Sequence, residues 1–147
     1  MFRTSSILAC AALAFSLSAA VSGPAAAGQE PSVTVNIPFS FSASDQKLPA
    51  GKYRISLVSP RYLSFLNTET TKHAYLMVLP ASTQNGKDQG RLMFRRYGSS
   101  NYLYQVWMPG QGEGREFMRS RGERETLRDL KGASLAQVQI PLGTAQH

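Results

Sequence analysis

Arginine and aromatic residues are interleaved along two neighbouring segments in the middle of the chain. The first segment is Arg91-Leu-Met-Phe-Arg95-Arg96-Tyr97, and the second is Tyr102-Leu-Tyr104-Gln-Val-Trp107. Guanidinium groups and aromatic rings that share a sheet surface can stack on bases, on sugars or on one another. The pattern therefore gives a candidate binding surface made of Arg95, Arg96, Tyr102, Tyr104 and Trp107.

The alternative is that these aromatic side chains pack in the core with the arginines lying over them, and the pattern favours this alternative. Gly98-Ser99-Ser100 separates the two segments and predicts a hairpin. A four-residue loop would pair Arg95 with Tyr104, whereas a three-residue loop would pair Phe94 with Tyr104 and Arg96 with Tyr102. The sequence leaves this register open.

A second group of arginines lies on a predicted helix near the C-terminus. Arg121, Arg124 and Arg128 are spaced three and four residues apart, which places them on one helical face. Such a stripe could hold phosphates or uronates. Acidic residues alternate with it, however, and Arg121 can pair with Glu125 four residues later. A solvated helix with surface ion pairs is the favoured alternative.

Residues for metal or catalytic chemistry are few. The chain has two histidines and one cysteine, and the spacings that mark zinc sites are absent. No G-x-S-x-G motif exposes a serine nucleophile. Glu113, Glu116 and Glu123 could serve a glycosidase, but their arginine neighbours favour ionised carboxylates in ion pairs. We therefore expect no catalytic residue, no metal and no cofactor.

The elements that position these residues are mainly strands. Apolar residues alternate with polar ones from Ser32 to Ser42, and Pro38 places this strand at a sheet edge or marks a bulge. The turn Leu48-Pro49-Ala50-Gly51 precedes a second strand that starts near Lys52. Further strands are predicted over 62–67, 73–79, 91–97, 102–108 and 136–140.

One helix is predicted, over 121–131. Ser120-Arg121-Gly122-Glu123 fits a capping box, and Gly132 lies at the expected stop. Leu127 and Leu130 are its only clear apolar anchors, so it should lie on the surface. Seven strands and one late helix predict an all-β fold, a single antiparallel β-barrel or β-sandwich with a C-terminal surface helix before the last strand.

The N-terminus has the pattern of a cleaved signal peptide covering residues 1–27. A short basic start precedes an apolar run of about 15 residues, shorter than the roughly 20 that a membrane-spanning helix needs. Ala25-Ala26-Ala27 then offers the cleavage site, which leaves a single domain over 28–147 without a transmembrane segment. Cys10 lies inside the apolar run, not at its end, so we interpret it as part of the leader and not as a lipidation site.

Six short motifs lie along the predicted mature chain. They are Ile37-Pro38-Phe39-Ser40-Phe41, Leu48-Pro49-Ala50-Gly51-Lys52-Tyr53, Arg91-Leu92-Met93-Phe94, Tyr97-Gly98, Val106-Trp107 and Ser120-Arg121-Gly122-Glu123-Arg124. Together they resemble a family of small exported β-rich proteins of soil-type Gram-negative bacteria, a family of uncharacterised activity. The resemblance covers most of residues 28–147 and implies export and one β-rich domain, with no catalytic residue carried over.

Composition sets the function class. The chain has 147 residues, 42% hydrophobic and 17% charged, which excludes a disordered tail and a multi-pass membrane protein. Its formal net charge of +7 favours anionic partners. We expect a non-enzymatic exported module, periplasmic or extracellular, that binds acidic envelope polysaccharide or lipid head groups, with no nucleic-acid partner. The alternatives are a carrier of a small apolar ligand and a carboxylate-based hydrolase of glycans. The oligomeric state stays open.

Overall fold

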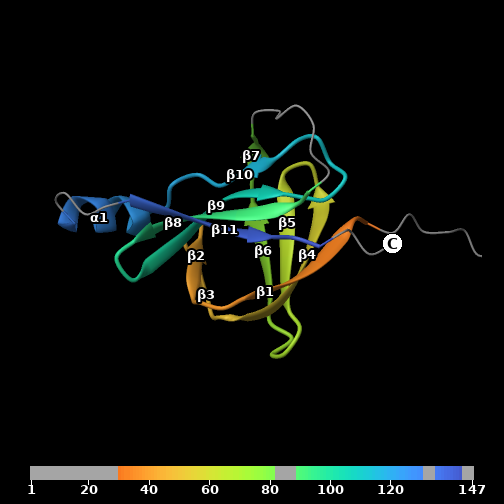
Figure 1. Cartoon of the computed structure of the whole chain (residues 1–147), viewed down its shortest axis with the longest axis horizontal. Coiled ribbons are helices and arrows are strands. Elements are labelled where there is room, and N and C mark those ends of the chain that lie inside the picture. Colours follow the sequence, from red (N-terminus) through yellow and green to blue (C-terminus); the bar gives the residue numbers. More distant parts are fainter. Residues whose placement is uncertain (1–29, 82–88, 131–134, 144–147) are drawn as a thin grey trace, which may run out of the picture.

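Two β-sheets enclose one hydrophobic core in the part of the chain that the computed structural model describes, residues 30–81, 89–130 and 135–143 (Figure 1). The first sheet is antiparallel and curled, with the strand order β1-β4-β5-β6. Its strands are β1 (Ser32–Ile37), β4 (Gly51–Ser59), β5 (Tyr62–Asn67) and β6 (His73–Met77).

The second sheet runs across the first and has the order β11-β8-β9-β10-β7. A short hairpin of β2 and β3 joins it, because Ser42 pairs with Tyr102 in a parallel bridge. Its elements are β2 (Phe41–Ala43), β3 (Gln46–Leu48), β7 (Leu79–Pro80), β8 (Arg91–Tyr97), β9 (Ser100–Trp107), β10 (Arg115–Glu116) and β11 (Leu135–Pro141).

The core follows from the alternation of the sequence, because every second residue of a strand faces inward. Val33, Val35 and Ile37 of β1 are buried in this way. Phe41 lies at the junction of the two sheets. Its ring centre is 5.7 Å from that of Tyr53 and 5.5 Å from that of Phe94, both in edge-on geometry, which aromatic pairs prefer.

The predicted fold class is confirmed: the described chain is mostly β, with one helix before the last strand. The seven predicted strands correspond to β1, β4, β5, β6, β8, β9 and β11. The prediction of one strand from Ser32 to Ser42 is wrong, because β1 ends at Ile37 and the chain crosses to the second sheet before β2. Pro38 lacks the N–H that a continued ladder would need. The predicted edge position of this segment is confirmed for β1.

Helix α1 (Arg121–Asp129) begins as predicted. Ser120 is the N-cap, and its hydroxyl accepts a hydrogen bond from the backbone N–H of Glu123 at 3.0 Å. The predicted apolar anchoring is wrong, because Leu127 is exposed and Glu123 is the buried residue of the helix. The predicted helix end at Lys131 and Gly132 lies outside the described residues, as does the predicted signal peptide. No helix among the described residues is long and apolar enough to cross a membrane.

Candidate functional site

The hairpin of β8 and β9 has a shorter turn than either register that the sequence left open. Tyr97 pairs with Ser100 and Arg95 with Tyr102, so the loop is the two residues Gly98 and Ser99. Gly98 adopts a φ of 58°, a left-handed conformation that glycine accepts without strain.

The same hairpin contains a β-bulge further from the turn. The bulge lies at Tyr104 and shifts the strand pairing by one residue, so that Met93 pairs with Gln105.

The aromatic residues predicted as a stacking surface are buried. Tyr102, Tyr104 and Trp107 each expose less than a tenth of their surface. The arginines of β8 lie over aromatic rings, with the Arg95 guanidinium 4.3 Å from the centre of the Tyr104 ring. Arg91 lies over Trp107 and Arg96 over Phe39 in the same manner, at 5.0 and 5.1 Å. This is the packing arrangement that the sequence favoured over an open recognition surface.

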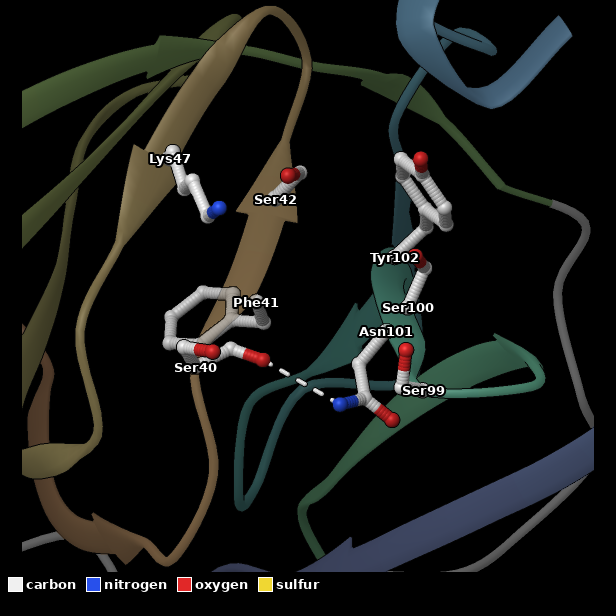
Figure 2. Close-up of a pocket in the computed structure, with 8 residues that line it drawn as sticks. All are labelled: Ser40, Phe41, Ser42, Lys47, Ser99, Ser100, Asn101 and Tyr102. Carbon is white, nitrogen blue, oxygen red and sulfur yellow. Dashed lines mark hydrogen bonds between the residues drawn. The ribbon is translucent and has the colours of Figure 1, made fainter. Parts of the chain in front are cut away.

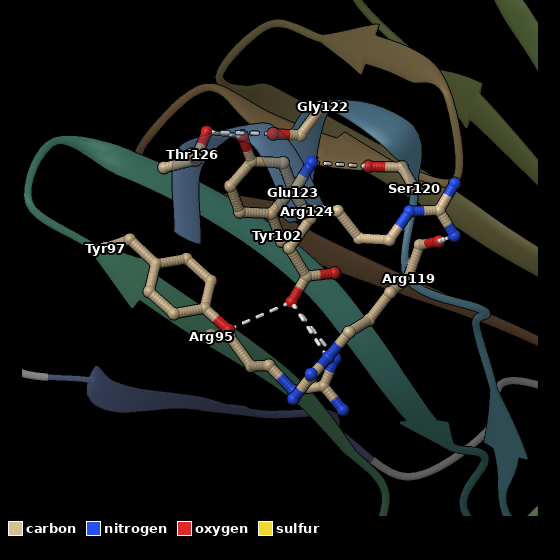
Figure 3. Close-up of polar contacts among 9 residues, drawn as sticks. All are labelled: Arg95, Tyr97, Tyr102, Arg119, Ser120, Gly122, Glu123, Arg124 and Thr126. Atoms are coloured by element: carbon tan, nitrogen blue, oxygen red, sulfur yellow. Dashed lines mark hydrogen bonds and ion pairs between the residues drawn. The ribbon is translucent and has the colours of Figure 1, made fainter. Parts of the chain in front are cut away.

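Arg95 has a second partner, the buried carboxylate of Glu123 on α1 (Figure 3). Glu123 is 3% exposed, and its Oε1 lies 3.1 Å from Nη1 of Arg95 and 3.8 Å from Nε of Arg119. The hydroxyl of Tyr97 donates to the same oxygen at 3.1 Å. A carboxylate that leaves water needs such partners, since an unpaired buried charge is strongly destabilising.

Glu123 changes the acid–base behaviour of its neighbour. Burial, together with the hydrogen bond and the negative charge of Glu123, raises the pKa of Tyr97 above the ordinary value for a phenol. A second polar contact joins the helix to β9, between the hydroxyls of Tyr102 and Thr126 at 2.8 Å. Arg95 and Tyr102, two predicted binding residues, thus hold α1 against the sheet.

The three arginines predicted on one helical face are exposed. Arg121 pairs with Glu125 at 2.8 Å, as the spacing predicted, and this contact raises the pKa of the Arg121 guanidinium. Arg124 lies within hydrogen-bonding distance of the backbone carbonyl of Arg119, at 3.4 Å, while Arg128 lies in the last turn. The helix therefore presents positive charge to solvent, partly offset by the exposed Glu125 and Asp129.

A polar cleft that the sequence did not predict lies between the β2–β3 hairpin and the start of β9 (Figure 2). Its volume is about 410 Å³. Lys47 and Ser42 project from the hairpin toward Ser100 and Tyr102 on the opposite wall. The lining residues are Ser40, Phe41, Ser42, Lys47, Ser99, Ser100, Asn101 and Tyr102.

The floor of the cleft is fixed by the buried side chain of Asn101. Its Nδ2 donates to the backbone carbonyl of Ser40 at 3.1 Å, which ties the two walls together. Its Oδ1 accepts from Nε of Arg96 at 2.7 Å. Arg96 thus supports the cleft from behind. Lys47, by contrast, is exposed and forms no ion pair within the described residues, so its ammonium is available to an anion.

The other candidate residues do not gather into a catalytic group. Glu113 pairs with the buried Arg115 at 2.8 Å, and Glu123 is occupied by its own partners. His73 contacts the hydroxyl of Ser64 and stacks on Tyr75. Within residues 30–81, 89–130 and 135–143, no three His, Cys, Asp or Glu side chains come together in a way that could hold a metal ion.

Sequence reasoning missed the cleft because its two walls are far apart in the chain. Serines at 40, 42, 99 and 100 form no motif, and Lys47 has no charged neighbour in the sequence beyond Asp45. No family model, curated protein or solved structure matches the chain. The resemblance to small exported bacterial proteins therefore stays a prediction.

Proposed function

We propose that this protein is a non-enzymatic, exported binding module that holds an acidic polysaccharide of the cell envelope in the cleft of Figure 2. The observation that carries the proposal is the lining, in which four serines surround a common space together with Lys47, whose ammonium has no ion-pair partner among the described residues. Hydroxyls can both donate to and accept from sugar hydroxyls, and an ammonium group attracts a uronate or a sulfate.

Electrostatics supports an acidic glycan over a neutral one. The chain carries a formal charge of +7, and the exposed arginines of α1 add to the attraction of an anionic polymer at long range. Lys47 supplies the contact at short range. The helical arginines are expected to affect the rate of encounter and its salt dependence, while the cleft selects the sugar.

The alternatives from the sequence receive no such support. Aromatic and aliphatic side chains from both sheets fill the core, which leaves the apolar-ligand carrier without a supporting observation among the described residues. The glycan hydrolase also lacks a supporting observation among the described residues, because Glu113 and Glu123 are both held in ion pairs with arginines.

The test is calorimetric titration of the purified protein with polygalacturonate, with neutral dextran as the comparison. Lys47→Gln should weaken polygalacturonate binding roughly fivefold, because an exposed charged contact contributes about 1 kcal/mol. Lys52→Gln is the matched control, since this exposed lysine lies outside the cleft and loses the same charge. Equal weakening by both variants, or equal binding of dextran, would overturn the proposal.

A further inference from the structure

An exposed apolar patch runs along the outer face of β6, beside Tyr62 at the start of β5, and continues past the end of β6. Met77 is 57% exposed, Tyr75 56% and Met118 69%, and Tyr62 and Leu79 are also exposed. Large apolar side chains scattered singly on a surface need no explanation, whereas a continuous patch indicates an interaction site. The question is therefore whether these five side chains are neighbours.

Strand register shows that they are. Tyr62 pairs directly with Met77 across β5 and β6, and Tyr75 lies two residues before Met77 on the same face of the strand. Met77 and Leu79 line a groove of about 300 Å³ together with Met118. The patch therefore runs without interruption from the middle of β6 to the segment before α1.

Arginines border the patch where it leaves β6. Arg119, Arg121 and Arg124 line the same groove as Met77 and Met118. Arg61 is exposed beside the same part of the patch, where its backbone carbonyl accepts from the N–H of Val78, between Met77 and Leu79.

Acidic groups offset only part of this charge. Asp45 is the one acidic residue of the groove lining, and its carboxylate accepts from the backbone N–H of Arg121. Glu125 pairs with Arg121, and the inward-facing carboxylate of Glu123 pairs with Arg95 and lies 3.8 Å from Nε of Arg119. Arg61 and Arg124 have no ion-pair partner within the described residues.

We infer that this face docks on an anionic lipid surface. Tyrosine, methionine and leucine side chains enter the head-group region of a bilayer, where an apolar body and a polar tip are both satisfied. Arg61 and Arg124 then reach lipid phosphates, each adding attraction to a negatively charged leaflet. This docking does not rest on saccharide binding, because the cleft is lined by other residues.

Charge favours a lipid surface over a second copy of the chain as the occupant. A two-fold contact uses the same patch on both subunits, so it brings the arginine border of one copy close to that of the other. Like charges held together at an interface are unfavourable, whereas phosphates neutralise them. The apolar area and the positive border thus complement an anionic bilayer.

The test is sedimentation of the purified protein with vesicles, either of phosphatidylcholine alone or of phosphatidylcholine with phosphatidylglycerol in equal parts. The parent protein should bind the anionic vesicles at least tenfold more strongly, with an affinity that falls as salt is added. Arg61→Gln/Arg124→Gln should remove most of this preference. The parent and all variants are purified in the same way and carry the same N-terminal segment, so differences in vesicle binding between them come from the substituted residues.

The apolar contribution is tested with Met77→Gln/Met118→Gln, which keeps side-chain length at two exposed positions. Its binding to anionic vesicles should fall roughly tenfold, because two apolar side chains no longer leave water. Leu135→Gln is the matched control, since Leu135 is 49% exposed on β11, outside the patch, and should bind as the parent does.

Three results would overturn the inference. The first is the absence of vesicle binding by the parent, and the second is equal binding by the Met77→Gln/Met118→Gln variant and the parent. The third is a dimer of the parent that the same variant abolishes while neither protein binds vesicles, which would assign the patch to self-association. Loss of polygalacturonate binding in Lys47→Gln with unchanged vesicle binding would separate this docking from the proposed function.

Discussion

The carboxylate of Glu123 accepts a hydrogen bond from the phenol of Tyr97 at 3.1 Å, inside the contact between α1 and β8. The same oxygen lies 3.1 Å from Nη1 of Arg95, which itself stacks on Tyr104. The Glu123 side chain thus connects the helix directly to Tyr97 and Arg95 and, through Arg95, to Tyr104. The helix is therefore held on the sheet by polar contacts where its sequence suggested leucines.

Glu123→Gln should destabilise the protein by about 2 kcal/mol, since it removes the charge that pairs with the mostly buried Arg95. The free energy of unfolding in urea measures this. Glu125→Gln removes an exposed partner of Arg121 and should cost less than about 0.5 kcal/mol. Equal losses in the two variants would contradict the structural role of Glu123.

Tyr97 should make the folded state sensitive to alkaline pH. Its pKa in the folded protein is raised above 10.0, so the folded state keeps the phenol proton longer than the unfolded chain does. The stability that this group contributes is present below pH 10 and is lost as the pH rises through the folded-state pKa.

Unfolding in urea, repeated from neutral pH to above pH 10, measures this effect. Tyr97→Phe should lose less stability over that range than the parent, because it has no phenol to ionise. Tyr75→Phe, at an exposed position, should follow the parent. A Tyr97→Phe variant with an undiminished loss would show that other groups cause the alkaline transition.

Gly114→Ala should destabilise the protein by about 2 kcal/mol through overpacking. A Cβ atom at Gly114 would lie 2.7 Å from the ring of Trp107, which is buried and rigid. A Cβ at Gly112 meets no atom within 4 Å, so Gly112→Ala is the matched control and should leave stability nearly unchanged. A thermal melt of both variants distinguishes them, and similar melting temperatures would contradict the tight Gly114–Trp107 contact.

Ser120→Ala should cost about 1 kcal/mol, because the N–H of Glu123 loses the hydroxyl that caps the helix. Ser120→Thr keeps a hydroxyl and should recover most of this loss. Urea unfolding of the three proteins gives the comparison. If the alanine variant were as stable as the parent, the cap would not be a source of stability.

The alternation of apolar residues was enough to predict the seven long strands, and the capping box was enough to predict where α1 begins. These signals are local, so they can be found without knowledge of tertiary contacts. The turn residues also marked the β8–β9 hairpin. Its register was not predictable, because it depends on a bulge at Tyr104 that tertiary packing decides.

The two surfaces proposed to bind partners were less predictable, because neither is continuous in the sequence. Lys47 and Tyr102 meet only after β2 has crossed to the second sheet. Met118, in the segment between β10 and α1, is 41 residues after Met77 in the sequence, and the two side chains come together only in the folded chain, where they line one groove. Of the residues that stood out in the sequence, Arg95 and Tyr102 hold α1 on the sheet, and Tyr102 also lines the cleft beside serines that form no sequence motif.

The hydrogen bond from Asn101 to the carbonyl of Ser40 joins positions 61 residues apart in the chain. Together with the Ser42–Tyr102 bridge, it means that the cleft assembles only when the early and late halves of the chain have met. Contacts of such high sequence separation slow folding, since the loop must close before they are made. The cleft and the closure of the core should therefore appear in the same kinetic step, and a partly folded chain should lack the proposed binding site.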